Sequence, residues 1–369
     1  MKNNRRIITF FLVILLFVVF IVIPSINNSE KIQNRFLLDF DSYDYKQNER
    51  IVLDEIETYH TFELIDEGED VFIPRKMGYR YGPSIIYYDD GTMDAWFASN
   101  GSSGQWDWIT YRHYDGQGWS NEEVVLKPTR SSLDHYSVCD PGVIYFNNYY
   151  YLGYTSTTNS KGVENNIFVA RSSKPNGPYE KWNGEGWGGN PKPIITYDEN
   201  DSGWGVGEVS FVIVEDKLYC YYSWINNEKS LMKLAIGDLS DNWPNTLEEK
   251  GEAISKINCQ DSCDVVYAEE YQKYIALCVE ARFSDESCIA VYESDDGLSF
   301  KQVDRIEDNV HKQCHNMGLS KKINGHINSN DDLIIGYAYS RSSNNTWGRW
   351  STKFHKAKLK TIYKKVEDN

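Results

Sequence analysis

The sequence is short of basic residues. It has 38 lysines and arginines against 54 aspartates and glutamates in 369 residues, which gives a net charge of −16. A protein that binds nucleic acid needs a basic surface to neutralise phosphates. The charge balance therefore argues against nucleic acid as a partner.

Cysteine is also scarce, and the spacing of the seven cysteines contains no CxxC pair of the kind that binds zinc. Their number is odd. Export of the chain would permit one or two disulfides. Cys220 and Cys278, however, lie inside apolar stretches, and we expect both to be buried free thiols.

Long helical periodicity is missing from the body of the chain. Aromatic residues make up 14% of the sequence, 27 of them tyrosines, and such rings fit the pleated surface of a strand. Short apolar segments alternate with Gly, Pro, Asn and Asp. Together these features predict an all-β fold.

The N-terminus carries the one long apolar run, residues 7–23, which is interrupted only by Thr9. Lys2, Arg5 and Arg6 precede the run, and no small-residue cleavage site follows it. This pattern predicts an uncleaved signal anchor at 1–24 and a polar tether at 25–50, with the rest of the chain outside the cell membrane. A cleaved signal and a secreted protein are the alternative.

The body of the chain repeats one pattern five times, which consists of an apolar strand, a turn, an aromatic-rich strand, a polar loop and a third strand. Equivalent positions in the first four copies, 58, 68 and 54 residues apart, are Ser84, Gly142, Ser210 and Asp264; a looser fifth copy starts near Met317. Five similar multi-strand units predict a five-bladed β-propeller over residues 51–362. Strand-like residues at 51–53 and 61–64 are candidates to complete the last blade. A twin β-sandwich is the competing fold, but it does not explain five copies.

In a propeller, the loops that enter the inner strands share one face with the loops between second and third strands. That face would collect Trp106, Asp107, Asp134, His135, Trp204, Asp264, Arg282, His315, Trp347 and Arg349. Acids and aromatic rings in one funnel suit a sugar ligand.

Three short motifs carry a family resemblance, and they lie at the starts of the second, third and fifth copies. They are Asp140-Pro141 followed by Tyr149-Tyr150-Tyr151-Leu152, then Gly207-Glu208-Val209-Ser210, and then Cys314-His315-Asn316-Met317-Gly318. Over about residues 75–360 the chain resembles glycoside hydrolase family 43 and its five-bladed relatives. The resemblance implies an inverting glycosidase of oligosaccharides or polysaccharide side chains, with His315 near the axis beside a possible Ca²⁺. No other cofactor is expected.

The chemistry of glycoside hydrolysis needs one protonated and one ionised carboxyl group. We predict Glu208, Asp140 and Asp264 as catalytic, and we expect Asp140 to keep the proton on Glu208 by like-charge repulsion. Asp264 is equally well explained as a buried acid bonded to backbone amides. The family's general base has no counterpart, because Gly82 occupies its position. Asp107 and Asp134 are candidate bases, and the predicted sugar-binding residues are Trp106, Asp107, Asp134, Trp204, Arg282, Trp347 and Arg349. The alternative is a propeller that binds a glycan or a protein without turnover.

Overall fold

The computed structural model describes residues 56–73, 78–199, 201–256, 261–340 and 349–365. The predicted anchor and tether lie outside these residues. Apart from the short 3₁₀ helix η2 (Trp243–Asn245), the regular elements of the described residues are all strands, as predicted. In this part of the chain, no helix has the length and apolar character needed to cross a membrane.

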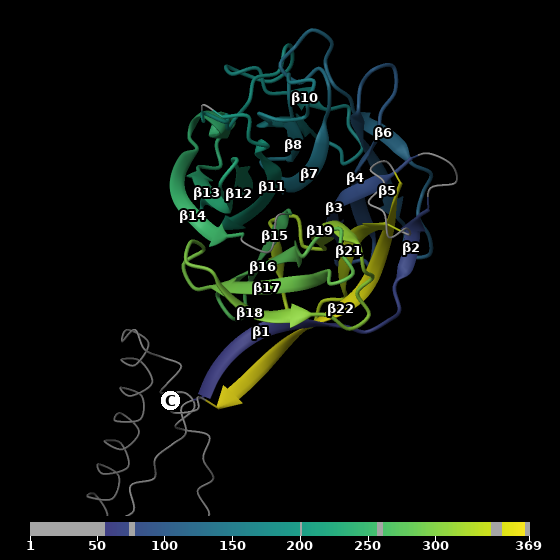
Figure 1. The fold of residues 1–369 in the computed structure, drawn as a ribbon, viewed down its shortest axis with the longest axis vertical. Helices are drawn as coiled ribbons and strands as arrows, with labels where there is room; N and C mark the ends of the chain where they lie inside the picture. Colours follow the sequence, from purple (N-terminus) through teal and green to yellow (C-terminus); the bar gives the residue numbers. More distant parts are fainter. Residues whose placement is uncertain (1–55, 74–77, 200, 257–260, 341–348, 366–369) are drawn as a thin grey trace, which may run out of the picture. The chain divides into compact units, whose positions relative to one another are not determined.

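The strands form five sheets placed radially around one centre (Figure 1). Blade 1 consists of β3 (Arg80–Tyr87), β4 (Met93–Asn100), β5 (Asp107–Tyr114) and β6 (Glu123–Leu126), and blade 2 of β7 (Cys139–Phe146), β8 (Tyr149–Ser156), β9 (Asn166–Ser172) and β10 (Glu180–Lys181). Blade 3 consists of β11 (Gly205–Val214), β12 (Lys217–Ile225), β13 (Ser230–Gly237) and β14 (Glu248–Ser255). Blade 4 consists of β15 (Cys263–Ala268), β16 (Lys273–Glu280), β17 (Cys288–Ser294), β18 (Lys301–Ile306) and the short β20 (His326–Ile327), which is parallel to β15.

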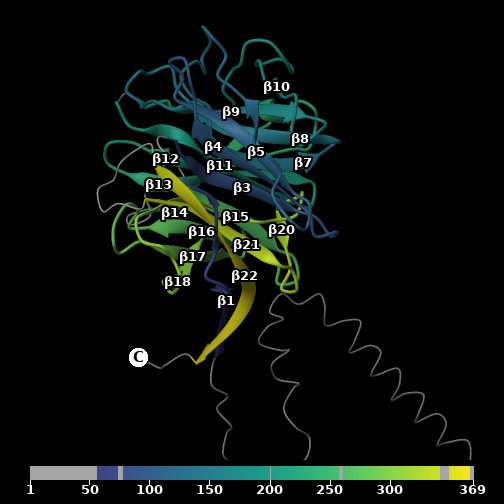
Figure 2. The ribbon, with the colours of Figure 1, turned by 90° about the vertical axis from the view of Figure 1, so that its right-hand side faces the viewer.

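Blade 5 joins segments from both ends of the described chain. Its strands are β19 (Cys314–Leu319), β21 (Leu333–Ser340) and β22 (Trp350–Lys365), with β1 (Ile56–Leu64) and β2 (Glu69–Phe72) both antiparallel to β22. The prediction that residues 61–64 complete the last blade is confirmed, and residues 51–53 lie outside the described chain. Beyond the pairing with β21, β1 and the end of β22 continue as a two-stranded ribbon (Figure 2).

The innermost strands β3, β7, β11, β15 and β19 contact one another in order around the axis. This closed ring confirms the five-bladed propeller. The inner strands approach closely because small residues face their neighbours. A Cβ atom on Gly142 would lie 2.0 Å from the carbonyl oxygen of Val209, and one on Gly318 would lie 1.8 Å from that of Pro83.

The core lies between the blades, where each sheet is covered on both faces. β17 is accordingly buried at all seven positions, which explains its nearly continuous apolar sequence. No disulfide joins the six described cysteines to one another, and Cys220 and Cys278 are fully buried as predicted. Cys259 lies outside the described residues.

Candidate active site

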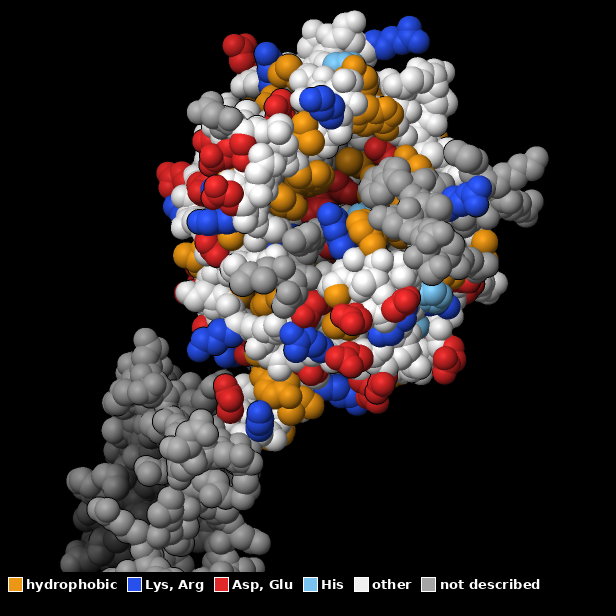
Figure 3. Space-filling model, viewed as in Figure 1, with side chains coloured by type: hydrophobic (Ala, Val, Ile, Leu, Met, Phe, Trp, Pro, Cys, Tyr) orange, Lys and Arg blue, Asp and Glu red, His pale blue; other side chains and the backbone are white. Residues whose placement is uncertain are grey.

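A pocket opens at the axis where the five inner strands begin, and each blade contributes one equivalent residue to it. These residues are Gly82, Asp140, Glu208, Ser262 and Asn316. The space-filling view shows acidic side chains inside a hollow in the middle of this face (Figure 3).

Backbone irregularity aims these side chains at the axis. In four of the five blades, the pairing of first and second strands slips at this position, between Tyr81 and Ser84 in blade 1 and at the matching residues of blades 2, 3 and 5. The bulged residues have left-handed φ angles of +55° at Gly82, +48° at Asp140, +54° at Glu208 and +34° at Asn316. Such a conformation costs a non-glycine residue about 1–3 kcal/mol and is found mainly at functional sites.

Asp140 and Glu208 meet at the side chain of Asn316. The Asn316 Nδ2 lies 3.5 Å from Asp140 Oδ1 and 3.2 Å from Glu208 Oε1. The two carboxyl oxygens are therefore less than about 7 Å apart, the sum of these distances. The two carboxyl groups are about 5–5.5 Å apart in retaining glycosidases and about 6.5–9.5 Å apart in inverting ones, so the upper limit for this pair reaches only the short end of the inverting range. The spacing of this pair is compatible with such chemistry.

Glu208 is held from the side away from Asn316. Ser223 Oγ donates to Glu208 Oε2 at 2.5 Å, and Lys256 Nζ in turn donates to Ser223 Oγ at 2.6 Å. The Lys256 ammonium is 3.9 Å from Glu208 Oε2 and fully buried. Thr155 Oγ1 accepts a 2.8 Å bond from the Glu208 backbone amide. Burial alone would lower the pKa of Lys256, but acidic neighbours including Glu208 outweigh it, so the lysine stays charged.

The two carboxyl groups differ in their electrostatic surroundings. Asp140 is 8% exposed and Glu208 6%. Burial, followed by the charge of Glu208, raises the pKa of Asp140 well above its ordinary value. Burial also raises the pKa of Glu208, but Lys256 opposes that rise. The Cys139 thiol, 3.2 Å from Oδ2, and the Thr155 hydroxyl also donate to Asp140.

Asp261 is a further carboxylate beside the pocket, and its surroundings favour its ionised form. Its Oδ2 accepts a 2.8 Å hydrogen bond from the backbone N–H of Asn316. Its carboxylate oxygens lie 3.2 Å from His315 Nδ1 and 3.7 Å from Arg282 Nη1. Burial opposes ionisation, but His315 and Arg282 outweigh it and lower the pKa of Asp261 to about 2. The His315 ring is enclosed by Tyr81, Phe283 and Trp350, with ring centroids 4.9–5.2 Å away.

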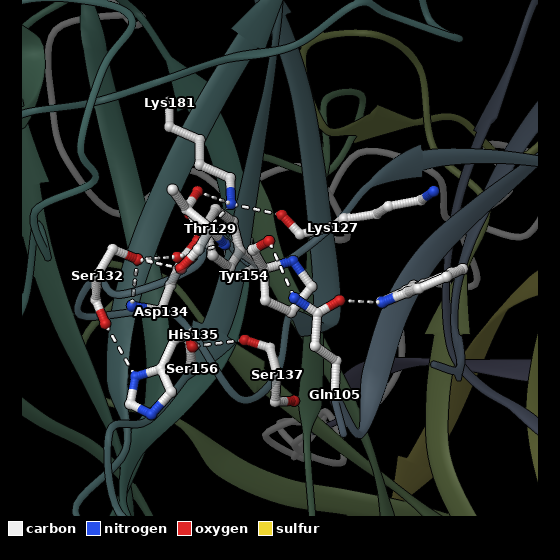
Figure 4. A network of polar contacts seen from close by, with 12 residues as sticks. Gln105, Lys127, Thr129, Ser132, Asp134, His135, Ser137, Tyr154, Ser156 and Lys181 are labelled. Atoms are coloured by element: carbon white, nitrogen blue, oxygen red, sulfur yellow. Dashed lines mark hydrogen bonds and ion pairs between the residues drawn. The ribbon is translucent and has the colours of Figure 1, made fainter. Parts of the chain in front are cut away.

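Two of the predicted acids are paired with buried lysines. Asp264 lines the pocket, but its Oδ1 accepts a 2.6 Å bond from Lys321 and its Oδ2 accepts the Leu319 amide at 2.8 Å. Asp134 is turned away to Lys181, in a network with Thr129, Ser132 and Tyr154 (Figure 4). The structure thus unites Asp140 and Glu208, and it leaves Asp134 outside the group that lines the pocket.

None of the remaining predicted residues that the structure describes belongs to the pocket lining. Asp107 is buried and accepts bonds from Tyr79 (2.5 Å) and Ser137 (2.7 Å), and burial raises its pKa. Trp204 packs against Gly207, next to Glu208, since a Cβ on Gly207 would lie 2.6 Å from its ring. Trp106 is 37% exposed, and its ring stacks on that of Tyr136 with a centroid-to-centroid distance of 4.8 Å. Arg349 is exposed, and Trp347 lies outside the described residues.

The residues near His315 do not suit a bound Ca²⁺. Calcium prefers six to eight oxygen ligands, whereas His315 is surrounded by three aromatic rings and Asp261 already serves N–H groups. Nowhere in the described chain do three His, Cys, Asp or Glu side chains gather closely enough to hold a metal ion. The ammonium of Lys321 supplies a positive charge nearby, bonded to Asp264 of the pocket lining.

Sequence reasoning missed Asn316, Asp261 and Lys256. The bulge places Asn316, rather than His315, in the position of Asp140 and Glu208. One signal was present, because each bulged residue precedes a small residue by two positions: Ser84, Gly142, Ser210 and Gly318. Aligning the copies on those small residues places Asn316 in the set.

Comparisons with known proteins support the fold. No protein-family model and no curated protein matches the sequence. Among solved structures, Zg3597, a family 117 glycoside hydrolase of the marine bacterium Zobellia galactanivorans, has a TM-score of 0.57 and 13% identity over 82% of this chain and 90% of its own. A thermostable family-43 glycoside hydrolase has a TM-score of 0.56 and 13% sequence identity, and the match covers 81% of this chain and 98% of the hydrolase. The α-L-arabinofuranosidase PaAbf62A of Podospora anserina, in complex with cellotriose, has a TM-score of 0.57 and 13% sequence identity. The match covers 78% of this chain and 95% of that enzyme. The chain therefore has the five-bladed propeller fold found in these glycoside hydrolases, as the resemblance implied.

Proposed function

We propose that the protein is a glycoside hydrolase whose carboxyl pair is Asp140 and Glu208. The observation that supports this function best is the pair of strained bulges that turn two buried acids toward one amide, Asn316. Strain of this kind persists where the surrounding structure enforces it, typically at active sites. The similar structures named above are glycosidases.

The pair supplies the two protonation states that the reaction needs. Two interacting carboxyls in one buried site raise one another's pKa, so that the group with the higher pKa keeps its proton while the other is ionised. We place that proton on Asp140, because Lys256 and Ser223 stabilise the ionised form of Glu208. Asp140 would then protonate the glycosidic oxygen while Glu208 activates water. The sequence argument assigned the proton to Glu208, and that assignment is the alternative.

Substrate would enter over Gly82, where the ring of pocket residues lacks a side chain. A Cβ atom there would lie 3.7 Å from Asp140 Oδ1, so the space borders the reacting carboxyl. Trp204, Arg282 and Trp106 are candidates for sugar contacts. An oligosaccharide or polysaccharide side chain, an inverting outcome and a site of action outside the cell membrane all belong to this proposal.

The test measures sugar release from a panel of glycans and aryl glycosides, starting with aryl α-L-arabinofuranosides because one similar structure is an α-L-arabinofuranosidase. Glu208→Gln and Asp140→Asn should each lower kcat by about 10²–10⁴-fold on a natural glycan. A substrate with a good leaving group should restore the turnover of Asp140→Asn, and added azide should restore the turnover of Glu208→Gln. The reverse pattern would return the acid role to Glu208. Normal turnover in both variants would remove the pair from catalysis.

A second function is favoured by Gly82. A missing side chain at the position of the family's base is consistent with a propeller that holds a glycan without cleaving it. Titration calorimetry with the same panel separates the two functions. Binding without any product after prolonged incubation would favour the binding protein.

A further inference from the structure

A segment of blade 5 crosses the axis at the end opposite the pocket. This axial segment, residues 320–327, follows β19 and runs past the ends of the other four inner strands. Each of those strands donates one backbone hydrogen bond to it, with lengths of 2.9–3.1 Å: Tyr87 to Lys321, Tyr145 to Ile323, Ile213 to Asn324 and Tyr267 to Gly325. The segment therefore ties blade 5 to every other blade.

Lys321 extends from this segment into the ring and is 2% exposed. Its ammonium donates to Asp264 Oδ1 at 2.6 Å, Ser210 Oγ at 3.1 Å and the Val265 carbonyl at 3.2 Å. Its own backbone pairs with blade 1, because its N–H donates to the Ile85 carbonyl at 3.1 Å. One residue of blade 5 thus links blades 1, 3 and 4.

The acceptors around this ammonium are a carboxylate, a hydroxyl and a carbonyl. These are the oxygen ligands that a hard metal cation such as Ca²⁺ or Na⁺ would use. A cation is needed here, because Asp264 is buried next to the pocket and an unpaired buried carboxylate is costly. With Lys321 in place, the position is filled and the charge of Asp264 is balanced.

We propose that Lys321 is a tethered axial cation that takes the place of a bound metal ion. The chain supplies its own positive charge at the centre of the propeller, so its stability does not depend on metal. Removal of the ammonium, with Asp264, Ser210 and Val265 unchanged, leaves a cavity that accepts a small cation. The inference is independent of the proposed hydrolase activity.

The first test uses the wild-type protein. After exhaustive dialysis against EDTA, elemental analysis should find far less than one metal ion per chain. The thermal unfolding midpoint should be the same with EDTA and with added Ca²⁺. A midpoint that falls with EDTA and recovers with Ca²⁺ would overturn the proposal.

The second test uses Lys321→Ala. Its midpoint should fall by roughly 10 °C, as expected when one member of a buried ion pair is lost. Ca²⁺, Na⁺ or methylammonium should then raise the midpoint in a saturable way. Lys321→Met, which fills the space without a charge, should be destabilised but not rescued, and adding Asp264→Asn to Lys321→Ala should abolish the rescue.

Lys322→Ala is the matched control. Lys322 lies in the same segment, but its side chain is partly exposed and 3.9 Å from the exposed Asp89. Its midpoint should change little and should not respond to these cations. If Lys321→Ala responds no more than Lys322→Ala does, the axis is no cation site and the proposal fails. If Lys321→Ala does not fold, the wild-type measurements still decide.

Discussion

At the scale of single residues, the contrast between Asp140 and Glu208 rests on Lys256. Loss of its charge in Lys256→Met should raise the pKa of Glu208. Activity that needs ionised Glu208 is lost as the pH falls through that pKa, so the acid limb of the kcat/KM profile should move to higher pH. Ser223→Ala should do the same to a smaller extent.

The same profile distinguishes the two role assignments. If Glu208 is the proton donor, activity is lost as the pH rises through its pKa, and Lys256→Met should shift the alkaline limb instead. Lys250→Met is the control, because Lys250 is partly exposed and pairs with the exposed Glu248. Its profile should match that of the wild type.

Asp261 links the site to stability. Its pKa is about 2, below the ordinary 3.8. A carboxyl group with a depressed folded-state pKa stabilises the fold fully above its unfolded pKa, and this contribution is lost as the pH falls from about 4 to 2. The contribution is roughly 2 kcal/mol. In urea titrations, the stability gap between wild type and Asp261→Asn should be constant from pH 5 to 7 and narrow below pH 4. A gap that does not depend on pH would contradict the lowered pKa of Asp261.

At the scale of elements, neighbouring inner strands lie so close together that even a methyl group does not fit between them at some positions. Gly142→Ala would force a methyl group to within 2.0 Å of the Val209 carbonyl oxygen, so β7 and β11 must move apart. We expect a loss of about 1–3 kcal/mol or more in urea unfolding. Gly118→Ala has nothing within 4 Å of its new Cβ and should change stability by less than about 0.5 kcal/mol. Equal effects would contradict the close approach.

The elements also show what sequence could and could not reveal. Repeating apolar strands and turns are local signals, so the blades and the starts of their inner strands were predictable. The partner of a buried acid is not local. Lys321 lies 57 positions after Asp264, and Lys181 lies 47 positions after Asp134. The left-handed bulge at Asn316 depends on a slip in strand pairing, which a single strand's sequence does not display.

At the scale of the whole molecule, β1 completes blade 5 as its outermost strand and joins the two ends of the described chain. Phe62 and Leu64 of β1 are buried, and Phe62 pairs in register with Leu359. Phe62→Asp would bury a charge between β1 and its neighbours. The thermal unfolding midpoint of this variant should therefore fall by roughly 10 °C relative to the wild type. Glu63→Ala removes only an exposed pairing with Lys360 and should leave the midpoint nearly unchanged. Similar midpoints for the two variants would show that the packing of β1 in blade 5 contributes little to stability.

The pairing of β1 with β22 has a consequence for biosynthesis. Thr61 pairs with Lys360, 299 positions further along the chain. A ribosome adds about 5–20 residues per second, so β1 waits roughly 15–60 s before its partner exists. During that interval β1 lacks its strand partner β22, and blade 4 residues such as Ile306 can cover only part of the apolar face with Phe62 and Leu64. The nascent chain therefore completes blade 5 only after β22 has been synthesised, and a chaperone that shields an early strand would serve it throughout the wait.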